Sequence, residues 1–154
     1  MKRDQARILN LLTILQQNGR QPIAELASDI GLSPAATLER IRKMELQKVI
    51  TGYHACLALD KIGLNINLIV KVKLNTVTET NVTAFEARMR SISFITEYYR
   101  LIGGSFDYFL KVAATDVKAY QCNVEYVLNN TGLIREMQVA TIVDCFSNFK
   151  LPIQ

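Results

Sequence analysis

A short stretch of the chain, residues 25 to 46 (ELASDIGLSPAATLERIRKMEL), carries a cluster of basic side chains. These are Arg40, Arg42 and Lys43. A guanidinium group presents a planar fork of donors that can pair with two acceptors on a guanine edge, and a lysine ammonium can pair with a phosphate. The spacing therefore indicates recognition of a polyanion by one face of a helix.

The elements that must position these residues are two short helices separated by a sharp turn. Residues 25 to 30 and 34 to 46 both read as helix. Gly31 suits the left-handed position that ends a helix. Ser33 can then cap the next helix with its side-chain oxygen, and Pro34 suits the first helical position. The second helix therefore leaves the first at a steep angle.

A third amphipathic helix is expected over residues 4 to 17, ahead of Asn18-Gly19. Apolar residues recur along all three helices at three- and four-residue spacing, so the helices are expected to share one small core. The residues that make up this predicted core are Ile8, Leu11, Leu12, Leu15, Ile23, Leu26, Ala27, Ile30, Leu38, Ile41 and Met44.

This arrangement predicts a helix-turn-helix whose second helix enters the major groove of DNA. Arg40 is the expected base-edge contact, and Arg42 and Lys43 are expected to meet phosphates. The full predicted DNA-binding set is Ser33, Pro34, Ala36, Thr37, Glu39, Arg40, Arg42 and Lys43. The alternative interpretation is that these are solvated charges on an ordinary three-helix bundle.

Charge is distributed unevenly along the chain. Residues 1 to 54 hold eight Lys and Arg against five Asp and Glu, a net charge of +3, while residues 55 to 154 hold ten against nine, a net charge of +1. Most of the positive excess therefore lies in the part that carries the predicted helix-turn-helix, which favours a polyanion partner for that part.

After residue 48 the pattern changes from helical to extended. Residues 49 to 57 are rich in β-branched and aromatic types and read as a short hairpin or extended strand, the wing of a winged helix-turn-helix. The predicted domains are residues 1–54 for DNA binding, residues 55–63 as a linker strand, and residues 64–154 as a second domain.

The second domain reads as β-α-β-β-α-β over about ninety residues, an α+β ferredoxin-like fold with both helices on one face of an antiparallel sheet. The other sheet face would stay uncovered, with Ile69 on it, so pairing with a second copy of the chain is expected. The predicted strands are residues 66–74, 94–102, 106–114 and 134–146, and the predicted helices are 82–92 and 117–128.

Cysteine content and hydropathy bound the class of protein. The chain has an odd number of cysteines, Cys56, Cys122 and Cys145, and no two of them form a C-x-x-C pair. They are therefore expected to be buried free thiols in a reducing compartment. No run of eighteen apolar residues is present. We expect a soluble cytoplasmic protein with no membrane partner, no metal and no cofactor.

The quoted residues carry a resemblance to a known family. The stretch GRQPIAELASDIGLSPAATLERIRKMELQKVITGYHACL resembles the DNA-binding half of the Lrp/AsnC, or feast/famine, regulators. The stretch GSFDYFLKVAATDVKAY resembles that family's glycine loop and following strand, and NFKLPIQ resembles its C-terminal end. Together these segments extend the similarity over nearly the whole chain.

The resemblance implies a transcriptional regulator that binds double-stranded DNA as a homodimer, with four dimers often closing into an octamer. It also implies that residues 64–154 form an effector-binding and oligomerisation domain, with an amino acid bound between two such sensing domains near the glycine loop and the last strand. The residues implied for that site are Gly104, Ser105, Phe106, Asp107, Tyr108, Gln138, Ala140 and Thr141. Ser105 and the stretch from Gln138 to Thr141 depart from the family pattern, which leaves the effector's identity open.

The residues of the loop allow two interpretations. Gly103 and Gly104 could aim backbone N–H groups at an α-carboxylate while Asp107 pairs with an α-ammonium. Alternatively the segment is a tight turn whose Asp107 satisfies backbone amides.

Two other functions are compatible with this architecture. One is a DNA architectural protein without an effector. The other is an enzyme resembling sirohaem decarboxylases, which use histidine chemistry on a tetrapyrrole. His54 is the only histidine, and no cluster of acids, bases or metal ligands accompanies it, so we expect no enzyme activity.

Overall fold

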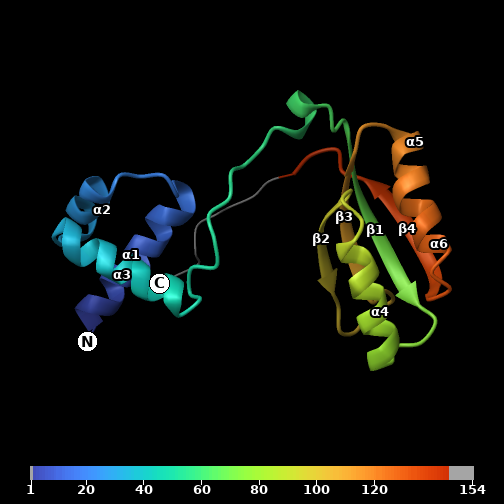
Figure 1. Cartoon of the computed structure of the whole chain (residues 1–154), viewed down its shortest axis with the longest axis horizontal. Coiled ribbons are helices and arrows are strands. Elements are labelled where there is room, and N and C mark those ends of the chain that lie inside the picture. Colours follow the sequence, from blue (N-terminus) through green and yellow to red (C-terminus); the bar gives the residue numbers. More distant parts are fainter. Residues whose placement is uncertain (1, 146–154) are drawn as a thin grey trace. The chain divides into compact units, whose positions relative to one another are not determined.

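The computed structural model describes residues 2–145 and divides them into two compact units, one extending to Cys56 and one spanning Leu57–Cys145. Figure 1 shows helices alone in the first unit and a sheet with helices in the second. The C-terminal stretch NFKLPIQ and residue 146 at the predicted end of the last strand lie outside the described residues. No helix within the described residues has the length and apolar character needed to cross a bilayer.

The first unit is built from α1 (Lys2–Gln17), α2 (Ile23–Ile30) and α3 (Pro34–Leu46). Gly31 ends α2 with φ at 64°, in the left-handed region that favours glycine. The Oγ atom of Ser33 caps α3 by accepting from Ala36 N–H at 3.3 Å. The predicted turn is therefore confirmed. The core of this unit contains Leu11, Leu26, Ile30, Ile41 and Met44, with Leu38 only half-buried beside it.

The predicted wing does not form a strand. Residues 51–58 have no regular secondary structure, and the segment predicted as a linker strand, residues 55–63, ends in the short 3-10 helix η1 (Leu59–Ile62). A strand requires a partner for its ladder of hydrogen bonds, and every regular element described in the first unit is a helix. The β-rich composition of the stretch is therefore not sufficient to form a hairpin.

The second unit has the predicted β-α-β-β-α-β order, and its sheet is antiparallel with strand order β2-β3-β1-β4. Its elements are β1 (Ile66–Leu74), α4 (Glu79–Arg90), β2 (Ile95–Arg100), β3 (Tyr108–Ala114), α5 (Val117–Tyr120), a π-helical turn (Gln121–Glu125), α6 (Tyr126–Asn129) and β4 (Ile134–Thr141). The helix predicted over 117–128 is thus present but contains a π-helical turn in its middle.

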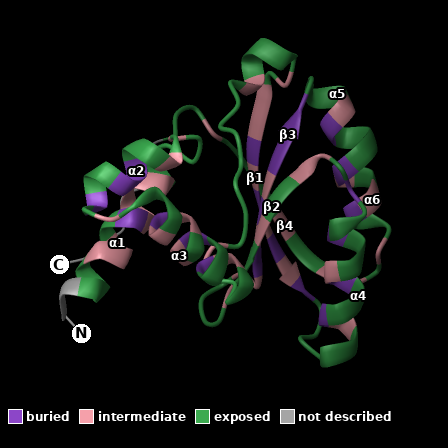
Figure 2. Cartoon of the chain, turned by 60° about the vertical axis from the view of Figure 1, so that its left-hand side comes forward, coloured by how far each residue is buried: buried purple, intermediate pink, exposed green. Residues whose placement is uncertain are grey.

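Both helical layers cover the same face of the sheet. Alternate residues of β1 and β3, such as Val70 and Leu110, are fully buried and pack with Phe85 from α4 and Leu128 from α6 in one cluster. Figure 2 shows buried positions along β1 and β3 and exposed positions on the outer sides of the helices. The opposite sheet face, which we call the open face, has no described helix packed on it.

The three cysteines are exposed, so the prediction of buried thiols is wrong. Cys56 lies in the segment without regular structure, and Cys145 follows β4. Cys122 lies in the π-helical turn, two positions from the buried residues Tyr120 and Val124 and therefore on the opposite, solvent side of the helix.

Candidate DNA interface and effector site

The exposed face of α3 is a stripe made by Ala35, Glu39, Arg42, Lys43 and Leu46. These residues recur at three- and four-residue spacing because Thr37, Ile41 and Met44 face the core. Arg42 and Lys43 are the two cations of the stripe, and both are exposed. The stripe therefore presents a guanidinium group and an ammonium group to solvent.

Other residues of the predicted DNA-binding set lie elsewhere. Ser33 and Pro34 are exposed at the start of α3, and Ala36 is half-buried. Thr37 is 0% exposed, and its hydroxyl donates to the carbonyl of Ser33 at 3.0 Å, so the prediction that it contacts DNA is wrong. The prediction overlooked that Thr37 continues the three- and four-residue spacing of the buried residues Ile41 and Met44.

Arg40 does not stand free on the exposed stripe. Its Nη2 atom donates to Asp4 Oδ1 of α1 at 3.0 Å, and its side chain is 28% exposed. The structure therefore places Arg42, rather than Arg40, as the arginine of α3 that is open to a partner.

The glycine loop connects β2 to β3 and exposes two consecutive glycines. Gly103 and Gly104 have φ values of 86° and 85°, a region that side chains rarely adopt. The loop is closed by a hydrogen bond from Leu101 N–H to Asp107 O at 2.8 Å. Ser105 is exposed at its tip. The predicted exposed loop is present, and the positive φ values at these two positions favour glycine.

Asp107 is occupied by contacts within the chain. Its Oδ1 atom accepts from Lys73 Nζ at 3.0 Å, and its Oδ2 atom accepts from Leu74 N–H at 2.8 Å. Its backbone N–H also donates to Val72 O at 2.9 Å. The side chain is 14% exposed. Of the two interpretations of this residue, the structure supports the one in which Asp107 satisfies backbone groups, and it does not offer the carboxylate to an ammonium ligand.

Tyr108 belongs to the core and not to the loop surface. It is 0% exposed, packs on Phe85 with ring centroids 4.7 Å apart, and donates to Glu86 Oε1 at 3.1 Å. Burial first, and then the bond to Glu86, raise the pKa of Tyr108 to about 12. Its predicted place in an effector site is therefore wrong, because Tyr108 lies opposite the buried Val72 in the β1–β3 pair and so faces the helices.

The predicted residues of β4 separate onto two faces. Gln138 lies opposite Lys71, and Ala140 lies opposite Ile69, so both are on the open face. Thr141 lies opposite the buried Leu68 and therefore on the other face. The register thus excludes Thr141 from any group that contains Gln138 and Ala140.

Lys71 is the functional candidate that the sequence prediction missed. Its Nζ atom lies 5.8 Å from the ring centroid of Phe106 and 6.0 Å from that of Phe109, both cation–π distances. Gln138 is its neighbour across the β1–β4 pair. We call Lys71, Phe106, Phe109 and Gln138 the Lys71 cluster. The signal in the sequence was a lysine at an outward position in the middle of a strand.

Lys71 differs from the other two lysines near it. Lys73 pairs with Asp107, and Lys111 pairs with Glu97 at 3.1 Å. Hydrogen bonds from Tyr99 and Lys111 lower the pKa of Glu97, and the Glu97 bond raises the pKa of Lys111. Among the described residues Lys71 has no carboxylate partner, and its ammonium group lies near two aromatic rings that carry no net charge.

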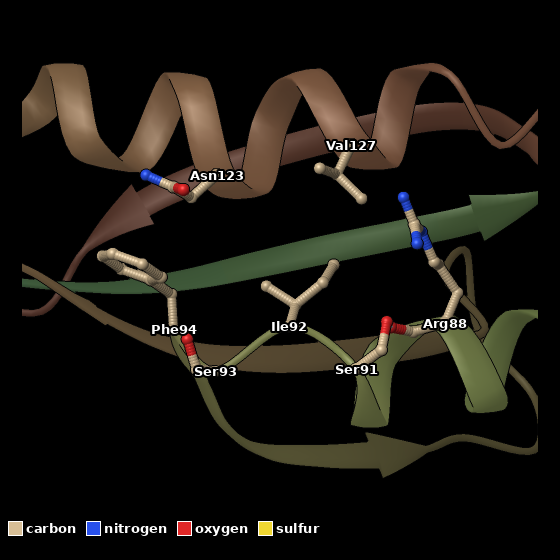
Figure 3. Close-up of a pocket in the computed structure, with 7 residues that line it drawn as sticks. All are labelled: Arg88, Ser91, Ile92, Ser93, Phe94, Asn123 and Val127. Atoms are coloured by element: carbon tan, nitrogen blue, oxygen red, sulfur yellow. The ribbon is translucent and has the colours of Figure 1, made fainter.

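A separate cavity of about 170 Å³ lies on the helix-covered side of the second unit. In Figure 3, Arg88 at the end of α4 and Asn123 of the π-helical turn approach it from facing helices. None of the predicted effector residues lines it; the lining residues are Arg88, Ser91, Ile92, Ser93, Phe94, Asn123 and Val127. Nor do three or more His, Cys, Asp or Glu side chains gather as metal ligands anywhere in the part of the chain that the structure describes.

Comparison with known families gives two matches that follow the division into units. Residues 8–45 match the AsnC-type helix-turn-helix domain, and residues 67–144 match the Lrp/AsnC ligand binding domain. The two matches together cover well over half of the chain.

Individual relatives agree with these matches. The chain is 40% identical over 111 residues to the proline dehydrogenase transcriptional activator of Rhodobacter capsulatus, covering 72% of this chain and 71% of that protein. It is 36% identical over 112 residues to the leucine-responsive regulatory protein of Salmonella typhimurium, covering 73% and 68%.

Solved structures have the same fold. An AsnC family transcriptional regulator from Agrobacterium tumefaciens superimposes with a TM-score of 0.83 at 26% identity, covering 95% of both chains. A transcriptional regulator from Neisseria meningitidis, solved as a complex with L-Met, superimposes with a TM-score of 0.85 at 24% identity, covering 95% of this chain and 94% of that one. The fold predicted from the sequence is confirmed, apart from the strand of the wing.

Proposed function

Because the chain belongs to the Lrp/AsnC family of transcriptional regulators, we propose that it binds duplex DNA through the exposed stripe of α3 and responds to an amino acid bound by its sensing domain. The family is one of regulators, so the expectation that the protein is not an enzyme is confirmed. The domains proposed for these roles are residues 1–54 and 64–154, in a protein of the cytoplasm.

The DNA-binding proposal is supported most directly by the exposure of Arg42 and Lys43 on a capped helix that follows a sharp turn. Arg42 is the better candidate for a base edge because its fork can make two parallel hydrogen bonds. Lys43 is the better candidate for a phosphate, since a single ammonium carries charge without a fixed pairing geometry. Ser33 and Pro34 are exposed at the start of α3 and are proposed to lie beside the sugar-phosphate backbone of the DNA.

The test of this interface is a titration of selected duplex DNA at several salt concentrations with Arg42→Gln, Lys43→Gln and the parent. Lys43→Gln is expected to weaken every sequence alike and to reduce the salt slope by about one unit, while Arg42→Gln is expected to relax preference at one base position. As the protein is proposed to act as a dimer, the selected site should be an imperfect palindrome with half-sites about ten base pairs, or a multiple of ten, apart. Equal affinity of all three proteins would remove α3 from the interface.

For the effector, we propose a site at a contact between sensing domains, formed by the glycine loop and the Lys71 cluster. An α-carboxylate would pair with Lys71 or with the N–H groups of Gly103 and Gly104, and Phe106 would contact the ligand's side chain. The support is that Lys71 has a charge without a carboxylate partner among the described residues and lies on the open face. A relative is named leucine-responsive and a structural neighbour was solved with L-Met, which favours an amino acid.

The open face is also proposed to be where two copies pair, and dimers are proposed to assemble to an octamer. Its residues include Ile69, Tyr99 and Phe109 among charged side chains. A mixed face of this kind suits a homodimer contact with a polar edge, and a ligand at that edge would touch two subunits.

The test measures the protein's melting midpoint in the presence of each of the twenty amino acids, including L-leucine and L-methionine. A ligand that binds only the folded protein raises this midpoint as the ligand concentration increases. Lys71→Gln should abolish the rise. Lys118→Gln, which removes an exposed lysine of α5, is the matched control and should keep it. No rise for the parent with any amino acid would favour the effector-independent architectural protein, and an equal rise in Lys71→Gln would remove Lys71 from the site.

A further inference from the structure

Arg40 of α3 is held by a carboxylate that comes from a different helix. The Asp4 side chain of α1 accepts from Arg40 Nη2 at 3.0 Å, across 36 positions of sequence. Both helices belong to the same compact unit. The helix proposed to enter DNA therefore carries one arginine that is already paired with an anion of its own chain.

The position of Arg40 on α3 explains why Asp4 can reach it. Thr37, three positions before Arg40, and Met44, four positions after it, are both buried. Residues at these spacings lie on the same side of a helix, so Arg40 leaves α3 at the border of its buried face. Arg42 and Lys43 leave it on the exposed stripe. For Arg40 to reach DNA on that stripe, its guanidinium group must first leave Asp4.

The pair is of a kind that DNA can displace. Asp4 is 61% exposed, and exposed ion pairs contribute little to stability because water screens the two charges. The same carboxylate also has Arg7 Nη1 at 4.0 Å, so it lies between two guanidinium groups. A phosphate oxygen offers an arginine the same charge-assisted hydrogen bonds that the carboxylate does.

We propose that Asp4 is an intramolecular competitor for DNA. It occupies Arg40 in the free protein, and a phosphate or a base edge must displace it before Arg40 contributes to binding. The proposal rests on the proposed function, in which α3 contacts DNA. Asp4 thereby lowers the affinity for DNA, because Arg40 must be released from the Asp4 carboxylate each time it contacts DNA.

The experiment is a fluorescence-anisotropy titration of the full chain with a selected duplex and with an unrelated duplex of equal length. The proteins are the parent, Asp4→Asn, Arg40→Gln, the double variant, and Glu25→Gln as a control that removes an exposed carboxylate of α2. Asp4→Asn is expected to tighten binding to both duplexes about two- to fivefold, the range set by the weakness of an exposed pair. In the Arg40→Gln background the same substitution is expected to give less than half of that gain.

Several outcomes would overturn the proposal. Unchanged affinity of Asp4→Asn would be one such outcome. Lower affinity would be another, and it would mean that Asp4 orients Arg40 for DNA. A gain equal to that of Glu25→Gln, or a gain that survives in Arg40→Gln, would show a general charge effect. The proposed function fails separately, if Arg42→Gln and Lys43→Gln bind as the parent does. Circular dichroism of each variant confirms that α1 and α3 are still folded.

Discussion

Replacing Asp107 by asparagine separates the structural role of this residue from a role in ligand binding. The carboxylate accepts one charged and one neutral hydrogen bond, from Lys73 Nζ and Leu74 N–H. An asparagine oxygen can keep the bond from Leu74 N–H, but the attraction to the ammonium is lost and an amide N–H₂ group is left without an acceptor.

The size of the effect follows from the burial of this pair. A hydrogen bond to a charged group contributes about 1.5 to 3 kcal/mol, and partial exposure of both partners, 14% for Asp107 and 29% for Lys73, lowers the expected loss to about 1 to 2 kcal/mol. For a unit of this size each kcal/mol corresponds to about 4 to 8 °C in the melting midpoint. The sensing unit should therefore melt several degrees lower while α1, α2 and α3 keep their stability.

The assay is thermal and guanidinium unfolding followed by circular dichroism, with amino-acid response and DNA affinity measured on the same preparations. Asp60→Asn is the control, because Asp60 pairs with Lys61 at 3.8 Å on the surface and should cost less than 1 kcal/mol. Lys73→Gln should be destabilising and should reduce the further effect of Asp107→Asn. A stable Asp107→Asn protein that loses its amino-acid response would refute the reasoning and return Asp107 to the effector site.

Three further predictions concern the sensing unit. Tyr108→Phe should lower the free energy of unfolding by about 1 kcal/mol, because Glu86 loses one donor. Since the pKa of Tyr108 is raised to about 12, the unfolded chain ionises first, and the parent's free energy of unfolding should fall between pH 10 and pH 12. The variant should lose less stability over this range, as measured by phenolate absorbance and denaturation. Gly104→Val should abolish effector response and assembly beyond the dimer, measured by light scattering, while DNA binding persists; its added Cβ meets no atom within 4 Å, so a variant that is merely strained, yet assembles and responds, would identify an ordinary turn. A fragment of residues 60–154 should be at least dimeric by light scattering at micromolar concentration, and a monomer would contradict pairing through the open face.

The sequence by itself determined the elements that depend on neighbouring residues. The turn before α3 was predictable because Gly31 and the Ser33-Pro34 pair act within a few positions of themselves. The strands and helices of the sensing unit were predictable because alternation and helical spacing report which side of an element is apolar. Family motifs added the function, which no local pattern states.

The positions of individual side chains in the candidate sites were decided by the tertiary structure. Arg40 is paired because α1 brings Asp4 to it, and Asp107 is occupied because β1 ends beside the loop and offers the Leu74 amide. Thr141 falls on the helix side of the sheet because of the register between β4 and β1. These contacts join residues far apart in the sequence, and a shift of one position in register or a small rotation of a helix would change each of them. A local sequence pattern carries no information about that alignment, whereas packing of the whole core sets it.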